Sequence, residues 1–273
     1  MNFHSNEWIM DRVREHYNDA LEQFPEDRIV GVFYQGSGNY GLDYEDSDVD
    51  TKCVLAPSLK ELAESKTTST TYVRENDEHI DFKDIRVMLE TFRKSNLNFL
   101  EILYTKYYII NPIYEKEWNK LIEARDAIVS MNLPSLIKSM KGIAGEKYHA
   151  LEHRYPSRIE WIDKFGYDPK QLHHLFRIKE FMHRWTNGES FEHCLISVEP
   201  EWLVDVKKGK YNLEDARRYG KGSMDFIQEM YEGYLKTCNS AVDESIYELF
   251  NDVSYNIIKI GIEKELGKNA THR

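Results

Sequence analysis

The sequence predicts an α+β fold followed by an all-helical region. Strand-like runs rich in β-branched and aromatic residues are confined to the first 112 residues, and only helical periodicity follows them. The chain has 273 residues, which is enough for two domains. We therefore expect one domain over residues 1–112 and a second, helical domain over residues 113–273.

The expected elements can be placed by their periodicity and by the residues that end them. Apolar residues recur at helical intervals over residues 5–23, and Pro25 ends this helix. Another short helix should begin after Pro57-Ser58, and helical spacing returns from Asp84. The expected strands are 28–35, 49–55, 70–73, 78–82 and 107–110. The expected later helices are 114–128, 134–153, 168–187, 201–208, 212–235 and 241–265.

Composition and charge narrow the class of protein. The net charge of −11 argues against a protein that coats nucleic acid non-specifically. Residues 138–184 nevertheless carry a local balance of +4, which fits either a solvated face or contact with a polyanion. The three cysteines form no CxxC pair, which favours a reducing compartment. Without a signal-peptide pattern or a run of about 18 apolar residues, we expect a soluble, cytoplasmic protein that does not enter a membrane.

Acidic residues interrupt two of the expected strands. Side chains alternate along a strand, so Asp48 and Asp50 should point the same way, about 6–7 Å apart. Asp81 adds another acid inside an apolar strand. Such carboxylates suit Mg²⁺ or Mn²⁺, and two ions could clamp the oxygens of a phosphoryl or nucleotidyl displacement. Alternatively, Asp48 and Asp50 are a surface pair, Ser47-Asp48 caps a helix, and Asp81 lies at a strand edge.

A glycine-rich turn precedes these acids. Gly36 permits close approach of the backbone to a ligand, and the backbone amides with the Ser37 hydroxyl could cradle phosphate oxygens. The order strand, Gly-Ser, Asp-x-Asp and a later strand Asp favours the binding interpretation over a chance pair.

The pattern G36-S37…D48-V49-D50 resembles the signature of the DNA polymerase β-type nucleotidyltransferase superfamily. The longer segment GSGNYGLDYEDSDVDTKCVLAPS is similar to one branch of it, the predicted bacterial and phage nucleotidyltransferases, some of them linked to RNA repair. Three further segments resemble that branch: HIDFKDIR (79–86), NLNFLEIL (96–103) and GYDPKQLHHLFRIKEFM (166–182). The resemblance covers about residues 29–188.

The resemblance implies a fold and roles for the motif residues. The first domain would be catalytic, with a small mixed β-sheet flanked by helices, and the helical domain would bind substrate. Asp48 and Asp50 would bind metal, Asp81 would complete the triad and activate the attacking hydroxyl, and Gly36-Ser37 would hold the triphosphate. Leu97 replaces the usual proline, and Thr51-Lys52-Cys53 replaces a frequent Arg-Gly pair; these departures bear on the substrate contacts that the resemblance implies and not on the chemistry.

The expected helix from residue 168 carries a row of basic groups. Lys170, His174 and Arg177 share a face and could contact the nucleotide or an acceptor phosphate, or form a solvent-facing ridge. His149 and His153 have the i,i+4 spacing of zinc ligands but no third ligand accompanies them, so we expect no zinc there.

These observations predict a nucleotidyltransferase dependent on Mg²⁺ or Mn²⁺. It would move a nucleoside monophosphate from an NTP, such as ATP, to an acceptor hydroxyl and release pyrophosphate. The acceptor could be an RNA end, a protein or a small molecule. The alternative is a catalytically silent nucleotide-sensing or antitoxin-like protein with the same fold. A phosphohydrolase with a His-Asp pair is disfavoured because the chain has no His-Asp dipeptide.

Overall fold

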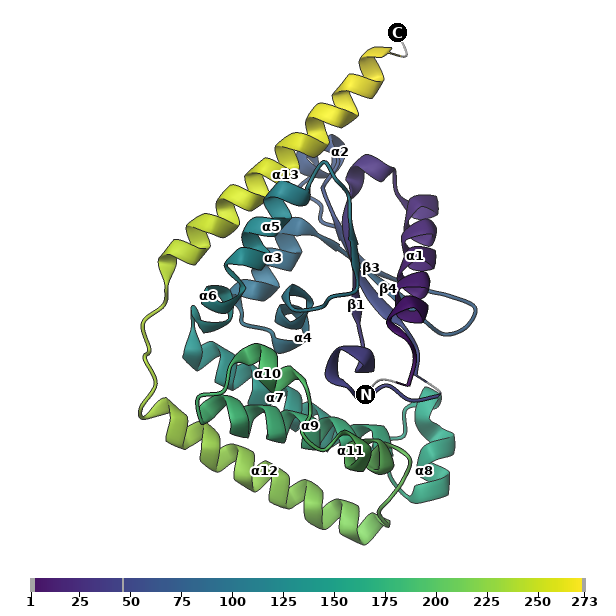
Figure 1. The fold of residues 1–273 in the computed structure, drawn as a ribbon, viewed down its shortest axis with the longest axis vertical. Coiled ribbons are helices and arrows are strands. Elements are labelled where there is room, and N and C mark those ends of the chain that lie inside the picture. The colour runs from purple at the N-terminus through teal and green to yellow at the C-terminus, as the bar shows by residue number, and fades with distance from the viewer. Residues whose placement is uncertain (1–2, 46, 272–273) are drawn as a thin grey trace. The chain divides into compact units, whose positions relative to one another are not determined.

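The computed structural model describes residues 3–45 and 47–271 (Figure 1). The chain divides into two compact units. Of the described residues, the sheet unit contains 3–39, 45, 47–131 and 242–271, and the helical unit contains 40–44 and 132–241.

The sheet unit is built around five strands in the order β3-β4-β2-β1-β5. Strands β2 and β4 are parallel, and the other neighbours are antiparallel. The strands are β1 (Ile29–Gln35), β2 (Asp50–Leu55), β3 (Ser69–Val73), β4 (His79–Asp84) and β5 (Tyr108–Ile110). No strand occurs after Ile110 in the part of the chain that the structure describes. The α+β class and the mixed sheet are therefore confirmed, and all five strands lie where the sequence predicts them.

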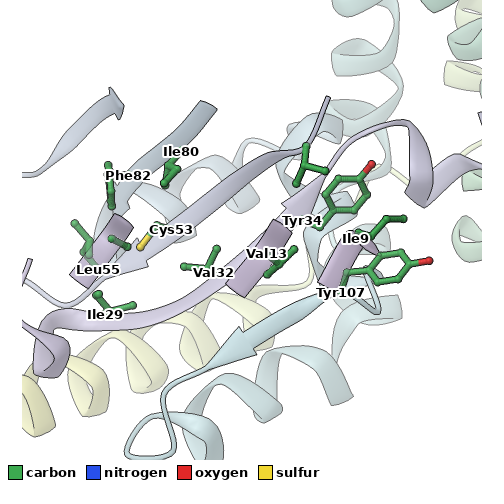
Figure 2. Close-up of a cluster of buried hydrophobic side chains, with 12 residues drawn as sticks. Ile9, Val13, Ile29, Val32, Tyr34, Cys53, Leu55, Ile80, Phe82 and Tyr107 are labelled. Carbon is green, nitrogen blue, oxygen red and sulfur yellow. The ribbon is translucent and has the colours of Figure 1, made fainter. Parts of the chain in front are cut away.

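One face of the sheet forms a hydrophobic core with helix α1 (Asn6–Gln23) (Figure 2). Alternate residues of each strand point to this face, because side chains along a strand change sides at every position. On α1 the buried residues recur at helical spacing, and Phe24 follows the helix at the break that Pro25 enforces. The cluster consists of Ile9, Val13, Ala20, Ile29, Val32, Tyr34, Val49, Cys53, Leu55, Ile80, Phe82 and Tyr107.

The opposite face of the sheet carries both apolar and charged side chains. Phe33 stacks on Trp118 of α5 (Glu115–Glu123), with ring centroids 4.4 Å apart. Lys52 lies beside Phe33 across the β1–β2 pair and beside Asp81 across the β2–β4 pair. Asp50, two residues before Lys52, belongs to this face as well. The sheet therefore separates its core from the candidate acidic residues.

The remaining helices of the sheet unit flank this sheet. They are α2 (Leu59–Ala63), α3 (Ile85–Arg93), α4 (Leu97–Leu100), α5, α6 (Arg125–Ser130) and α13 (Glu244–Thr271). The 3₁₀ turns of this unit are Glu26–Arg28, Glu101–Leu103 and, extending one residue into the helical unit, Ser37–Tyr40. Helix α2 begins with a complete capping box between Ser58 and Glu61, which satisfies amides that a helix leaves unpaired.

The helical unit has a long three-helix centre, in which α9 contacts both α7 and α12 (Figure 1). Its helices are α7 (Leu133–Ala150), α8 (Ile159–Phe165), α9 (Pro169–Thr186), α10 (Phe191–Leu195), α11 (Pro200–Lys207) and α12 (Leu213–Leu235), with a 3₁₀ turn at Pro156–Arg158. The sequence predicts all of these helices except the short α8 and α10, whose five to seven residues are too few to establish a period.

The compact units do not follow the expected boundary at residue 112. Helices α5 and α6 pack with the sheet unit, and α13 returns to it across α3 and α5. On α13, Glu265 accepts the Leu59 N–H at 2.9 Å, and Asn251 accepts a hydrogen bond from Arg93. Helical periodicity shows that a helix has an apolar face but not which unit covers it, and this explains the difference. The assignment of catalysis and substrate binding to separate domains stays a prediction.

Among the described residues, no helix is both long and apolar enough to cross a membrane.

Candidate nucleotidyl-transfer site

The turn after β1 depends on its glycine. A Cβ on Gly36 would lie 2.7 Å from the Tyr34 hydroxyl, closer than real Cβ contacts allow. That hydroxyl in turn accepts the N–H of Gly38 at 2.9 Å. The buried Tyr34 therefore fixes the turn, and only a residue without a side chain fits at position 36.

The turn brings Ser37 to the start of β2. Its Oγ donates to Ser47 Oγ at 3.1 Å, although ten residues separate the two serines. Ser47 directly precedes Asp48 in the chain. The structure thus brings together the Gly-Ser turn and the Asp-x-Asp segment, and their binding roles stay predictions.

Asp48 and Asp50 lie at the beginning of β2. Asp48 is exposed, and Asp50 is the first residue of the strand. Burial raises the pKa of Asp50, and the negative charge of Asp48 raises it further, while His79 opposes both. The two carboxylates are therefore close enough to repel each other.

Glu78 and His79 make hydrogen bonds that fix the Asp48-Val49-Asp50 segment. Glu78 Oε1 accepts the N–H of Val49 at 3.2 Å. His79 donates its backbone N–H to Asp50 Oδ1 at 2.9 Å, and its Nδ1 lies 3.1 Å from the same oxygen. Both the backbone between the two aspartates and the Asp50 carboxylate are fixed by the chain that enters β4.

Glu78 is itself fixed by cations and by helix α1. Its side chain is 5% exposed and is bonded by Arg12, Arg74 and His16. Burial would raise the pKa of Glu78, but hydrogen bonds from His16 and Arg12 outweigh it and hold this pKa well below its usual range. The buried His16 also lies 2.9 Å from Thr51 Oγ1. This network ties α1 to the first residues of β2.

Asp81 has a different environment from the one we expect. Its carboxylate lies 3.3 Å from Lys52 Nζ and 2.9 Å from Lys83 Nζ. Among the described residues, no group of three His, Cys, Asp or Glu side chains is arranged to hold a metal ion. The resemblance implies that Asp81 completes a carboxylate triad. In this structure the Asp81 carboxylate is instead paired with lysines of β2 and β4, and its role as third carboxylate stays a prediction.

Lys52 is a further charged residue of this face. Its side chain is 5% exposed, and its ammonium lies 4.0 Å from the centre of the Phe99 ring. Burial lowers the pKa of Lys52, and the negative charges of Asp81 and the buried Glu101 oppose that effect. Glu101 also accepts a hydrogen bond from Gln35. Lys52 is thus a buried cation between two acids, two residues from Asp50.

Sequence reasoning missed Glu78, His79, Lys52 and Glu101 as members of this region. One signal could have pointed to the network: His16 recurs with Val13 and Ala20 on the apolar face of α1, where a histidine requires a partner. For Glu78 no such signal exists, because Arg12 and His16 precede it by more than 60 residues.

The predicted basic row lies in the helical unit, on α9. Arg177 is 8% exposed, its Nε has no hydrogen-bond partner in the described part of the chain, and its guanidinium lies 3.9 Å from the centre of the Tyr40 ring. Burial, and then the positive charges of nearby groups that include Arg177, Lys170 and Lys147, lower the pKa of His174 well below its usual value. Lys170, His174 and Arg177 are therefore neighbours within this unit, and the lowered pKa leaves the His174 ring neutral near pH 7. Tyr40, which Arg177 contacts, follows Ser37 by three residues in the sequence.

Comparison with known proteins finds similarity to one family over the first half of the chain. Residues 13–132 match the model of the RNA repair pathway DNA polymerase beta family. The resemblance to the polymerase β-type nucleotidyltransferases is thereby confirmed over this part of the chain. The match spans β1, the Gly-Ser turn, Asp48, Asp50 and Asp81, and supports a general nucleotidyl-transfer role.

A structural comparison also matches a nucleotidyltransferase-like protein from Exiguobacterium sibiricum. The sequences are 10% identical, the match covers 83% of this chain and 78% of that one, and the TM-score is 0.30. Among curated proteins, none matches the chain.

Proposed function

We propose that the protein is a metal-dependent nucleotidyltransferase, which moves a nucleoside monophosphate from an NTP to an acceptor hydroxyl. The observation that carries this proposal is the approach of two elements. The Gly36-Ser37 turn and the Asp48-Val49-Asp50 segment meet at the start of β2 through the hydrogen bond between Ser37 and Ser47. A phosphate-binding turn and a pair of carboxylates are the two parts that this chemistry needs.

The donor set suits a hard divalent cation at Asp48 and Asp50. Their oxygens are the ligands that Mg²⁺ and Mn²⁺ prefer. The raised pKa of Asp50 reflects repulsion by Asp48 as well as burial, and a cation between the two carboxylates would remove that repulsion. Bound there, Mg²⁺ would neutralise charge on the phosphate oxygens that react.

Asp81 fits this role only after a change of partners. We propose that it acts as the third carboxylate and accepts the proton of the attacking hydroxyl. To do so it must give up its contacts with Lys52 and Lys83, which both lie within 3.3 Å of its oxygens. Released from Asp81, the ammonium of Lys52 would be available to the phosphates of the substrate.

The remaining groups would bind and orient the nucleotide. Gly36 and Ser37 would contact the triphosphate, and Lys170, His174 and Arg177 would bind the nucleotide or the acceptor phosphate. A buried guanidinium such as Arg177, with an unpaired Nε, is suited to a phosphate because the ligand would supply the missing acceptor. The acceptor oxygen would then attack the α-phosphorus while the bond to the β-phosphate oxygen breaks, and pyrophosphate would leave.

The choice of acceptor can be tested directly. Purified protein would be incubated with each α-³²P-labelled NTP and Mg²⁺, together with short RNA, total protein or small hydroxyl compounds, and the products separated on gels. We expect label in one acceptor class. Binding of Mg-NTP without label transfer or pyrophosphate release would instead favour the catalytically silent, nucleotide-sensing alternative.

A further inference from the structure

The helical unit contains a cavity that none of the proposed nucleotide-binding residues line. It has a volume of about 610 Å³, opens to solvent, and is lined by residues of α9, of α12 and of the segment 198–211. Small-molecule sites have volumes of about 300–1,000 Å³, so its size suits one nucleotide. On α9 it uses Phe176, Lys179 and His183, which do not share the face of Lys170, His174 and Arg177.

Aromatic side chains form much of its wall. Phe176 and Trp202 are stacked, with ring centroids 5.1 Å apart and planes 19° from parallel. Trp202 Nε1 donates to the Tyr211 hydroxyl at 3.1 Å, and Tyr211 packs against Tyr219 at 4.9 Å. Trp202 is therefore held in place by a ring on one side and a hydrogen bond on its edge. A planar ligand could stack here at low entropic cost.

The polar groups of the cavity differ in whether they are already paired. Glu180 accepts bonds from Arg184, Ser197 and the Val198 N–H. Lys179 makes no ion pair with any acid in the described ranges, and its ammonium lies 5.4 Å from the centre of the Phe226 ring. An anionic group on the ligand would give Lys179 the counter-charge that the protein does not supply.

One position opens the cavity on the α12 side. Gly222 lines it, and a Cβ added there would meet nothing within 4 Å. Glycine is otherwise unfavourable inside a helix, by about 1 kcal/mol relative to alanine. The absence of a side chain at this position keeps space next to the aromatic wall.

We propose that this cavity is a stacking subsite for an unpaired nucleotide, in which the base lies against the aromatic wall and the phosphate approaches Lys179. Aromatic rings with a nearby cation are the combination by which proteins hold single-stranded nucleic acid. The role of this nucleotide as part of an acceptor strand rests on the proposed function, but its binding does not. A free mononucleotide and a strand end share the chemistry, and the experiment separates them.

The test is binding of a fluorescein-labelled hexaadenylate RNA, measured by fluorescence anisotropy at 0.15 M salt with EDTA and without NTP, so that no transfer occurs. Gly222→Leu fills the cavity and should weaken binding about tenfold, the loss expected for one stacked base. Gly233→Leu is the matched control. It lies on the same helix, also has open space at its Cβ and does not line the cavity, so it should bind as the wild type does.

Competition with AMP identifies the source of the nucleotide. Displacement of the labelled RNA by AMP, absent in Gly222→Leu, would show that a single nucleotide suffices; failure of AMP to compete would show that the strand is needed.

Equal affinities of the two leucine variants, or no saturable binding of either probe to the wild type, would overturn the proposal. Asp50→Asn should bind the RNA normally, so loss of transfer in that variant bears on the proposed function and not on this subsite.

Discussion

Glu78 accepts the backbone N–H of Val49 at 3.2 Å, and Val49 lies between the two candidate metal-binding aspartates. In the described part of the chain, no hydrogen bond joins this carboxylate to the Gly36-Ser37 turn or to Asp48, yet it fixes the backbone that carries both aspartates. Its own position is set by Arg12, His16 and Arg74. The geometry of the site therefore depends on helix α1.

Replacing Glu78 by Gln should reduce both stability and turnover. The change leaves three basic groups around a neutral side chain, and breaking a buried ion pair costs roughly 3 kcal/mol. A shifted Val49 should lower kcat more than it raises KM for NTP, because the reacting geometry is disturbed more than binding. Urea unfolding and steady-state kinetics measure these effects. Glu22→Gln, at an exposed position of α1, is the control and should change neither.

Asp50→Asn and Asp81→Asn should affect the metal-free protein in opposite directions. Asparagine at position 50 removes the repulsion by Asp48, so stability should be unchanged or up to about 0.5 kcal/mol higher. Asparagine at position 81 deprives the buried Lys52 of its carboxylate and should cost about 1–3 kcal/mol. Urea unfolding of the wild type and both variants in EDTA measures these changes in stability. An Asp81→Asn variant as stable as the wild type would show that the Lys52–Asp81 pair contributes no net stability.

Arg177→Ala should lower kcat/KM for NTP or for the acceptor, with a loss of roughly 1–3 kcal/mol in transition-state binding. The reason is that a buried guanidinium with an unpaired Nε gains a hydrogen bond when a phosphate binds. Arg217→Ala is the comparison, since Arg217 is exposed and already paired with Glu152. Equal kcat/KM values for the two variants would show that Arg177 only packs against Tyr40 and does not bind a phosphate.

Acid should destabilise the helical unit through His173. Burial lowers the pKa of this histidine to about 3, and its Nδ1 lies 2.8 Å from the Leu203 carbonyl oxygen. The unfolded chain takes up the proton below about pH 6.5 and the folded chain does not, so stability falls as the pH drops from about 6.5 toward 3. At pH 5 this amounts to about 2 kcal/mol for one such histidine.

The effect of His173 can be isolated by comparing two pH values. His173→Asn keeps a donor for the Leu203 carbonyl and removes the titrating ring, so its loss of unfolding free energy between pH 7 and pH 5 should be smaller than that of the wild type. Chemical denaturation at both values gives the difference. An identical loss in the two proteins would mean that His173 is protonated in the folded state.

The sequence was sufficient for elements whose signal is local. Alternating or continuous apolar runs identified the strands, and the Gly-Ser and Asp-x-Asp spacing identified the turn and the two aspartates that the structure brings together. The pairing of Asp81 with Lys52 could not be predicted, because the register of β2 against β4 sets Lys52 beside it, and register depends on pairing between distant segments. The return of α13 to the sheet unit escaped prediction for a similar reason: Leu59 and Glu265, which bond to each other, are 206 residues apart.

The central claim is that Asp48 and Asp50 support nucleotidyl transfer, and pyrophosphate release tests it most directly. Wild type, Asp50→Asn and the control Asp77→Asn would be given Mg²⁺, NTP and the acceptor class identified by the labelled-NTP gels. Asp77 is a suitable control because it lies in a turn with a φ of 64°, which asparagine also adopts readily. For the wild type and Asp77→Asn, we predict one pyrophosphate released for each labelled acceptor. For Asp50→Asn, we predict a rate of pyrophosphate release at least a hundredfold lower. That loss corresponds to about 2.7 kcal/mol, which is typical of removing one charge-stabilising group. Equal rates in all three proteins would contradict the account.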